Sequence, residues 1–259
     1  MLLTRECLTF TTAAGNCGGK WERMRERMRD TITFEAGGAR ASLRPSEVPG
    51  RPLVVLNSYE DDGGGVAAAL AELGAPDCSL LTVYGLDWDR DMSPWPAPGA
   101  DRNGPPFPGD AEAYLRRLLE EILPEACARL PYAPGDICIA GYSLAGLFAL
   151  WSLFRCQVFS RAACVSGSLW YPGAAEFFRD RVPVRLPDRL YLSLGDREAA
   201  VRHPLLRTVR ERTEETAGRF RALGVPVTLE WNPGNHFREP ERRTAKGIQA
   251  MLTEAAEQT

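Results

Sequence analysis

Ser143 has the sequence surroundings of a catalytic nucleophile. It lies in GYSLAG (141–146), between an apolar run at 137–140 and an apolar segment that begins at Leu144. A strand, a sharp turn and a helix in this order form a nucleophile elbow, which needs small residues two positions before and after the serine. Gly141 and Ala145 meet this need. The alternative is that Ser143 only caps the N-terminus of the following helix.

A serine hydroxyl needs a general base, and His236 is the better placed of the two histidines. It lies in the loop NPGNHF (232–237), directly after a predicted strand at 228–231. It also comes last in the chain order serine, acid, histidine that a nucleophile elbow uses. His203 adjoins Arg202 and Pro204 at a predicted helix start, where capping, a substrate contact or simple exposure to solvent are equally expected, so it is the weaker candidate for the base. We therefore predict His236 as the base.

Two carboxylates compete for the role of the acid that orients this histidine. The predicted strand at 190–194 runs into GDRE (195–198), which contains Asp196 and Glu198. Hydrolases that use a nucleophile elbow commonly place the acid three residues after such a glycine, and this spacing favours Glu198. Asp196 remains the alternative.

The elements that must position these residues alternate along the chain. Apolar runs without polar alternation predict strands covered on both faces by helices. The predicted strands are 53–56, 79–84, 137–140, 162–166, 190–194 and 227–231, and the predicted helices are 66–73, 110–130 (perturbed near Pro124), 144–154, 174–179, 204–223 and 242–256. A hairpin at 31–35 and 39–43 precedes them, and a long loop spans 87–108. This pattern predicts an α/β fold of the α/β-hydrolase type, with a mostly parallel central sheet, helices on both faces and an N-terminal antiparallel hairpin.

Composition narrows the function classes. The 259 residues, 44% of them hydrophobic, fit a single domain spanning 1–259. A net charge of -3 with mixed signs predicts no nucleic-acid partner, and no apolar run approaches the roughly 20 residues of a membrane span. We read no secretory signal in the first 20 residues. Seven scattered cysteines suggest a reducing cytoplasm, and two histidines give too few ligands for zinc, so we expect no metal and no cofactor.

Four sequence blocks taken in order resemble one family. GYSLAGLFALW, SGSLWYPG, LYLSLGDRE and LEWNPGNHF look like the putative-esterase branch of the α/β hydrolases, which includes esterase D-like enzymes and siderophore trilactone esterases. The resemblance extends from about Leu53 to the C-terminus. It implies Ser143 as nucleophile, Glu198 as acid and His236 as base.

The same resemblance implies an oxyanion hole and a reaction. One donor would be the backbone N–H of Leu144, and the second that of Ser58 or Tyr59, although LNSYEDDGG stands here in place of a His-Gly or Asp-Gly turn. The expected reaction cleaves a small, soluble ester or thioester through an acyl-enzyme on Ser143. Two alternatives stay open: an acyltransferase of the same fold, and a non-catalytic protein that binds a ligand or partner.

Aromatic residues gather on the loops expected at the carboxyl edge of the sheet. They are Trp88, Trp95, Trp170, Tyr171 and Trp231. We predict that Trp170, Trp95 and Trp231 wall an apolar pocket. No cluster of arginine or lysine is committed to a bulky catecholate substrate, and the sequence leaves the oligomeric state open.

Overall fold

The computed structural model describes residues 31–100 and 104–253. An eight-stranded sheet with the order β1-β2-β4-β3-β5-β6-β7-β8 forms its centre. The strands are β1 (Ile32–Ala36), β2 (Ala39–Arg44), β3 (Leu53–Asn57), β4 (Ser79–Tyr84), β5 (Ile137–Tyr142), β6 (Arg161–Val165), β7 (Arg189–Gly195) and β8 (Val227–Asn232). All pairs from β4 to β8 are parallel, whereas β2 pairs antiparallel with β1 and β4. The predicted α/β-hydrolase fold, with its N-terminal hairpin, is confirmed.

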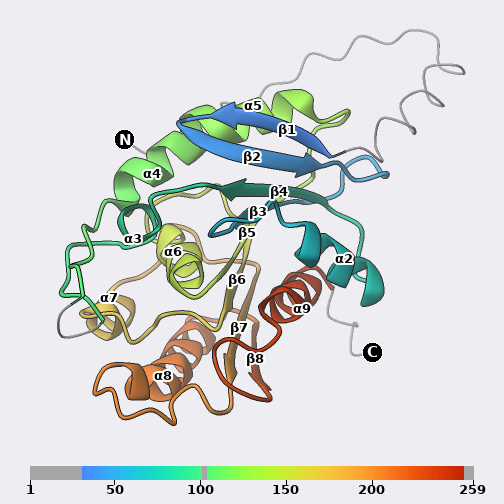
Figure 1. The fold of residues 1–259 in the computed structure, drawn as a ribbon. Helices are drawn as coiled ribbons and strands as arrows, with labels where there is room; N and C mark the ends of the chain where they lie inside the picture. Colours follow the sequence, from blue (N-terminus) through green and yellow to red (C-terminus); the bar gives the residue numbers. More distant parts are fainter. Residues whose placement is uncertain (1–30, 101–103, 254–259) are drawn as a thin grey trace, which may run out of the picture.

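Helices cover both faces of this sheet (Figure 1). On one face lie α2 (Gly64–Glu72) and α9 (Pro240–Leu252), which pack against each other. On the other lie α4 (Ala111–Arg117), α5 (Leu123–Arg129), α6 (Leu144–Ser152), α7 (Ala174–Asp180) and α8 (Val209–Ala222), with the short helix α3 (Trp88–Asp91). A 3₁₀ turn, η3 (Leu206–Thr208), precedes α8.

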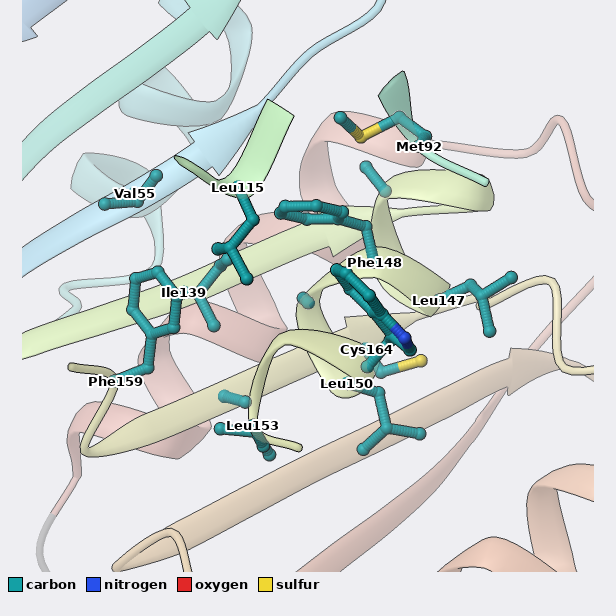
Figure 2. Close-up of a cluster of buried hydrophobic side chains, with 14 of the residues drawn as sticks. Val55, Met92, Leu115, Ile139, Leu147, Phe148, Leu150, Leu153, Phe159 and Cys164 are labelled. Carbon is teal, nitrogen blue, oxygen red and sulfur yellow. The ribbon is translucent and has the colours of Figure 1, made fainter. Parts of the chain in front are cut away.

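Each face has its own hydrophobic core. Successive side chains of a strand point to opposite faces, so neighbouring residues of one strand enter different cores. In β3, Val55 belongs to the core beneath α6, and Val54 and Leu56 belong to the core beneath α2 and α9. Figure 2 shows the first core, where Phe148 of α6 packs near Leu115 of α4. A strand buried on both faces reads as a continuous apolar run, which is why β3 was predictable.

The predicted helix at 110–130 is one helical rod with a defect. A π-helical turn, η2 (Leu118–Ile122), separates α4 from α5, and Pro124 lies in the first turn of α5. Proline has no N–H to donate and its ring clashes with the carbonyl four residues earlier, that of Glu120. The wider turn relieves that clash, as expected from the predicted perturbation near Pro124.

The last helix is shorter than predicted at its C-terminal end. It ends at Leu252 rather than Ala256, and residues 254–259 lie outside the described part. The first 30 residues also lie outside it, so the prediction about a secretory signal there is not tested by the structure. The described residues contain no helix that is long and apolar enough to cross a membrane.

Candidate active site

The turn between β5 and α6 holds Ser143 in a strained conformation. Its φ of 60° and ψ of -122° lie in a region that L-residues rarely adopt. A Cβ on Gly141 would lie 2.2 Å from the backbone oxygen of Ala145, so only glycine fits there. A sharp, strained turn from strand to helix that presents the serine hydroxyl at the edge of the sheet is the geometry of a nucleophile elbow.

The structure brings the three predicted catalytic residues into one hydrogen-bonded chain. Ser143 Oγ lies 3.1 Å from Nε2 of His236, and Nδ1 of His236 lies 2.7 Å from Oε2 of Glu198. The serine follows β5, the acid follows β7 and the histidine follows β8, so all three extend from the carboxyl ends of parallel strands. A hydroxyl, an imidazole and a carboxylate in this order are the parts of an activated nucleophile.

The carboxylate of Glu198 is buried, and both of its oxygens have hydrogen-bond partners. Its side chain is 5% exposed, and Oε1 accepts hydrogen bonds from Gly195 N (2.6 Å) and Ser166 Oγ (2.8 Å). Burial acts to raise the pKa of Glu198, but the hydrogen bond and charge of His236 and the bonds from Gly195 and Ser166 outweigh it, so the pKa is lowered. The carboxylate is therefore ionised at neutral pH and holds Nδ1 of the imidazole as a donor.

Asp196, the alternative acid, has a different partner. Its side chain lies on an exposed part of the loop, where Oδ1 accepts a hydrogen bond from Gly234 N at 2.7 Å. This bond ties the loop after β7 to the loop that carries His236. The structure thus places Glu198, and not Asp196, against the imidazole.

Arg243 of α9 is a site residue that our sequence analysis missed. Its side chain is 3% exposed, and NH1 lies 3.2 Å from Oε1 of Glu198 while NH2 donates to the carbonyl of Pro233 at 2.9 Å. The guanidinium therefore holds both the acid and the backbone near His236. The signal was present in the sequence, because Arg243 precedes the buried Gly247 and Met251 by one and two helical turns on the apolar face of α9.

The two proposed second oxyanion donors differ in availability. The amide of Ser58 donates to the carbonyl of Val83 at 2.9 Å, so it is already used. Tyr59 follows it and lines the same cavity as Ser143. Leu144 begins α6, and the first amides of a helix have no intrahelical acceptor. The prediction of Ser58 as a donor is therefore wrong, because its amide is bonded within the sheet, whereas Leu144 and Tyr59 stay predictions.

A cavity of about 840 Å³ opens above Ser143 and His236. The residues that line it are Leu56, Asn57, Ser58, Tyr59, Asp61, Val66, Leu86, Asp87, Trp88, Asp89, Tyr142, Ser143, His236, Phe237, Pro240, Glu241 and Thr244. Trp88, one of the aromatic loop residues noted in the sequence, is among them. The volume of the cavity lies in the range of small-molecule sites.

The predicted aromatic wall is wrong for this cavity, because Trp170, Trp95 and Trp231 are not among its lining residues. Nε1 of Trp95 donates to the carbonyl of Pro172 at 2.8 Å. Trp170 packs against Phe107 and Tyr171, and the ring of Trp231 lies under the guanidinium of Arg210. Position at a strand end fixes where a residue lies, but not which way its side chain points.

The remaining candidates have structural roles. Nδ1 of His203 lies 3.3 Å from the amides of Leu205 and Leu206, as a helix-capping acceptor does. No group of three or more histidine, cysteine or acidic side chains in the described segments is arranged to hold a metal ion.

Solved structures with the same fold include several hydrolases. An IroE-like serine hydrolase from Shewanella oneidensis superposes with a TM-score of 0.72 at 17% identity, covering 85% of this chain and 79% of that one. Siderophore hydrolase EstA from Aspergillus nidulans gives 0.67 at 18% identity, covering 94% and 99%. The enterobactin esterase FES from Shigella flexneri gives 0.63 at 16%, covering 86% of this chain but 58% of its own. At such identities these likenesses establish the fold.

Sequence comparison identifies the family. Uncharacterized protein YbbA from Bacillus subtilis (strain 168) is 22% identical over 180 residues, which are 61% of this chain and 72% of YbbA. The family described as "Putative esterase" matches residues 63–222, a segment that includes Ser143 and Glu198 and ends before His236. Since this match covers more than half of the sequence, the chain belongs to the "Putative esterase" family.

Proposed function

We propose that this protein is a serine hydrolase of carboxylic esters or thioesters that works through an acyl-enzyme on Ser143. The observation that carries the proposal is the chain of contacts from Ser143 Oγ to His236 Nε2 (3.1 Å) and from His236 Nδ1 to Glu198 Oε2 (2.7 Å). Membership of the esterase family supports ester hydrolysis independently of that geometry.

The reaction has two acyl-transfer steps. Ser143 Oγ attacks the ester carbonyl carbon while its proton moves to Nε2 of His236, and the carbonyl π pair moves onto oxygen. The tetrahedral intermediate collapses, the bond to the leaving oxygen or sulfur breaks, and His236 returns the proton to that atom. Water then attacks the acyl-enzyme by the same route and releases the acid.

Two backbone amides supply the proposed oxyanion hole. We assign these roles to the N–H of Leu144, which begins α6 directly after Ser143, and to the N–H of Tyr59, a residue that lines the cavity beside Ser143. Each such donor contributes on the order of 3 kcal/mol to transition-state stabilisation because it is fixed before the charge develops. Asn57 also lines the cavity, and its side-chain Nδ2 is buried and without a hydrogen-bond partner in the described structure.

We also propose the cytoplasm as the place of action. The five cysteines in the described segments are all free thiols. Burial raises the pKa of Cys78 and of Cys164 to about 12, so both stay protonated and unreactive. Free thiols of this kind, four of the five buried, fit a reducing compartment.

Labelling with a fluorophosphonate probe, read by intact mass, tests the nucleophile before any substrate is known. We expect one adduct on the wild type, none on Ser143→Ala, and one on the control Ser152→Ala, a buried serine of α6 whose hydroxyl donates within its own helix. An unlabelled wild type would contradict the proposal and favour a non-catalytic binding protein. Product analysis with an added alcohol separates hydrolysis from acyl transfer, since a transferase would form the new ester.

A further inference from the structure

The cavity beside Ser143 is negatively charged. Four carboxylates line it, those of Asp61, Asp87, Asp89 and Glu241. No lysine or arginine is among its lining residues in the segments that the structure describes. Among the described residues that line the cavity, the imidazole of His236 is therefore the only basic side chain.

Most of this charge is not neutralised. Asp87 lies 3.4 Å from Arg90 in a pair that is half exposed on both sides. Asp61 accepts its hydrogen bonds from neutral donors, Ser58 Oγ at 2.8 Å and Gly63 N at 2.7 Å. Neutral donors leave the full charge of a carboxylate in place.

Arginines on the elements around the cavity are engaged with other acids. Arg44 pairs with Asp62 at 2.9 Å, and Arg242 pairs with Glu72 at 3.4 Å. Neither Asp62 nor Glu72 lines the cavity. These two arginines therefore do not offset the cavity's charge, and the half-exposed pair of Arg90 with Asp87 offsets only part of it.

Aromatic rings face the same space. Tyr59 and Trp88 meet edge to face with ring centroids 5.4 Å apart, and Tyr59 is 58% exposed. Phe237, directly after the catalytic histidine, is 85% exposed. Aromatic faces attract cations through their quadrupole and bury apolar groups equally well, so they complement the carboxylates.

We propose that the substrate is an ester that carries a cationic group, such as a quaternary or protonated amine, beside an apolar portion. This inference rests on the proposed esterase function and names the substrate class of that same site. The acidic side chains attract the cation, the rings of Tyr59 and Trp88 receive it, and the ester carbonyl reaches Ser143. An anionic ester is repelled by the same four carboxylates.

The size of the effect follows from the cavity's shape and charge. A concave site with low-dielectric walls concentrates the field of its charges and raises the local concentration of a counter-ion. The carboxylates are exposed, so salt screens them beyond roughly 10 Å at 0.1 M ionic strength. We expect a preference of about tenfold for a cationic over a neutral ester at low ionic strength, decreasing as salt is added.

Two isosteric esters measure this preference directly. In 3-(trimethylammonio)phenyl acetate and 3-tert-butylphenyl acetate the acyl group and the shape are the same, and the charge differs. Their kcat/KM values are each divided by the alkaline hydrolysis rate of the same ester, which removes the difference in leaving-group reactivity. The anionic 3-carboxyphenyl acetate completes the series, and we expect it to be the poorest substrate.

A triple variant tests the assignment to these side chains. Asp61→Asn, Asp89→Asn and Glu241→Gln together keep the shape of the cavity and remove three charges. We expect the cation preference to fall toward one. Glu121→Gln is the matched control, because Glu121 is an exposed carboxylate of η2 that does not line the cavity, and it should keep the wild-type ratio.

The readouts separate this inference from the proposed function. Hydrolysis of all three esters at similar normalised rates would overturn the charge preference and leave the esterase in place. If no ester is cleaved, binding of the two product phenols to Ser143→Ala, measured by calorimetry, decides the preference by itself. Equal affinities for 3-(trimethylammonio)phenol and 3-tert-butylphenol would overturn it there as well.

Discussion

Replacing Glu198 with glutamine should abolish most of the activity through the tautomer of His236. Oε1 of Glu198 accepts hydrogen bonds from Gly195 N, Ser166 Oγ and the guanidinium of Arg243. In the Glu198→Gln variant the amide oxygen must take that position, because an NH₂ group would meet three donors. The NH₂ group then points at Nδ1 of His236 and needs an acceptor there.

An imidazole that accepts at Nδ1 carries its proton on Nε2, and such a ring cannot take the proton of Ser143. Loss of the correct tautomer typically lowers kcat/KM about 10³–10⁴-fold, or roughly 4–5.5 kcal/mol of transition-state stabilisation. The side chain keeps its volume and three of its contacts, so the fold should persist and is checked by circular dichroism.

The assay is kcat/KM for an aryl ester together with the rate of fluorophosphonate labelling. Asp196→Asn is the matched control, because asparagine retains the oxygen that accepts from Gly234 N. We expect this control to stay within about twofold of the wild type, as an exposed, isosteric change should. A Glu198→Gln variant within tenfold of the wild type, or an equal loss in Asp196→Asn, would refute the assignment of the acid.

Three further predictions concern stability. Arg243→Met leaves Glu198 buried without its guanidinium and should cost about 3–5 kcal/mol in urea unfolding, whereas Arg242→Met, next to it but exposed, should cost less than about 1 kcal/mol. In the same assay Gly141→Ala should be strongly destabilising, because its Cβ meets backbone at 2.2 Å, but Gly218→Ala, in open space within α8, should stabilise by roughly 0.5–1 kcal/mol. The pKa of Glu198 is lowered in the folded state, so its ionised carboxylate stabilises the fold above the unfolded pKa of about 4.3, and this stability is lost as the pH falls through the folded pKa. The difference in melting temperature between wild type and Glu198→Gln should therefore shrink below about pH 4. A difference that stays constant with pH would contradict this prediction.

The parts of the site that the sequence predicted are those fixed by local backbone rules. The turn at Ser143 requires a small residue at position 141, and apolar runs predict the strand and the helix on either side of it. The nucleophile elbow can therefore be recognised from this short stretch of sequence. His236 was identified because one loop after the last strand contains a histidine. In both cases the chemistry and its signal lie within a few residues of each other.

The parts that it missed depend on side-chain direction or on distant contacts. The spacing after Gly195 favoured Glu198 but left Asp196 open, and the path of that loop turns Glu198 toward His236 and Asp196 toward Gly234. Ser58 and Tyr59 are equivalent candidates in the sequence, and only the structure shows that the amide of Ser58 donates to β4. That use of the Ser58 amide depends on a neighbouring strand from a distant part of the sequence, so no local pattern encodes it.

Helix α9 links the acid of the site to the charge of its cavity. Three successive residues at its start, Glu241, Arg242 and Arg243, point about 100° apart around the helix axis. Glu241 faces the cavity, Arg242 faces Glu72 at the surface, and Arg243 faces Glu198. A Cβ on Gly65 of α2 would lie 2.9 Å from Cγ of Glu241, so the close packing of α2 fixes this rotation. A change at Glu241 can therefore alter which ester is accepted without touching the catalytic groups, whereas Arg243 cannot be changed without disturbing the acid.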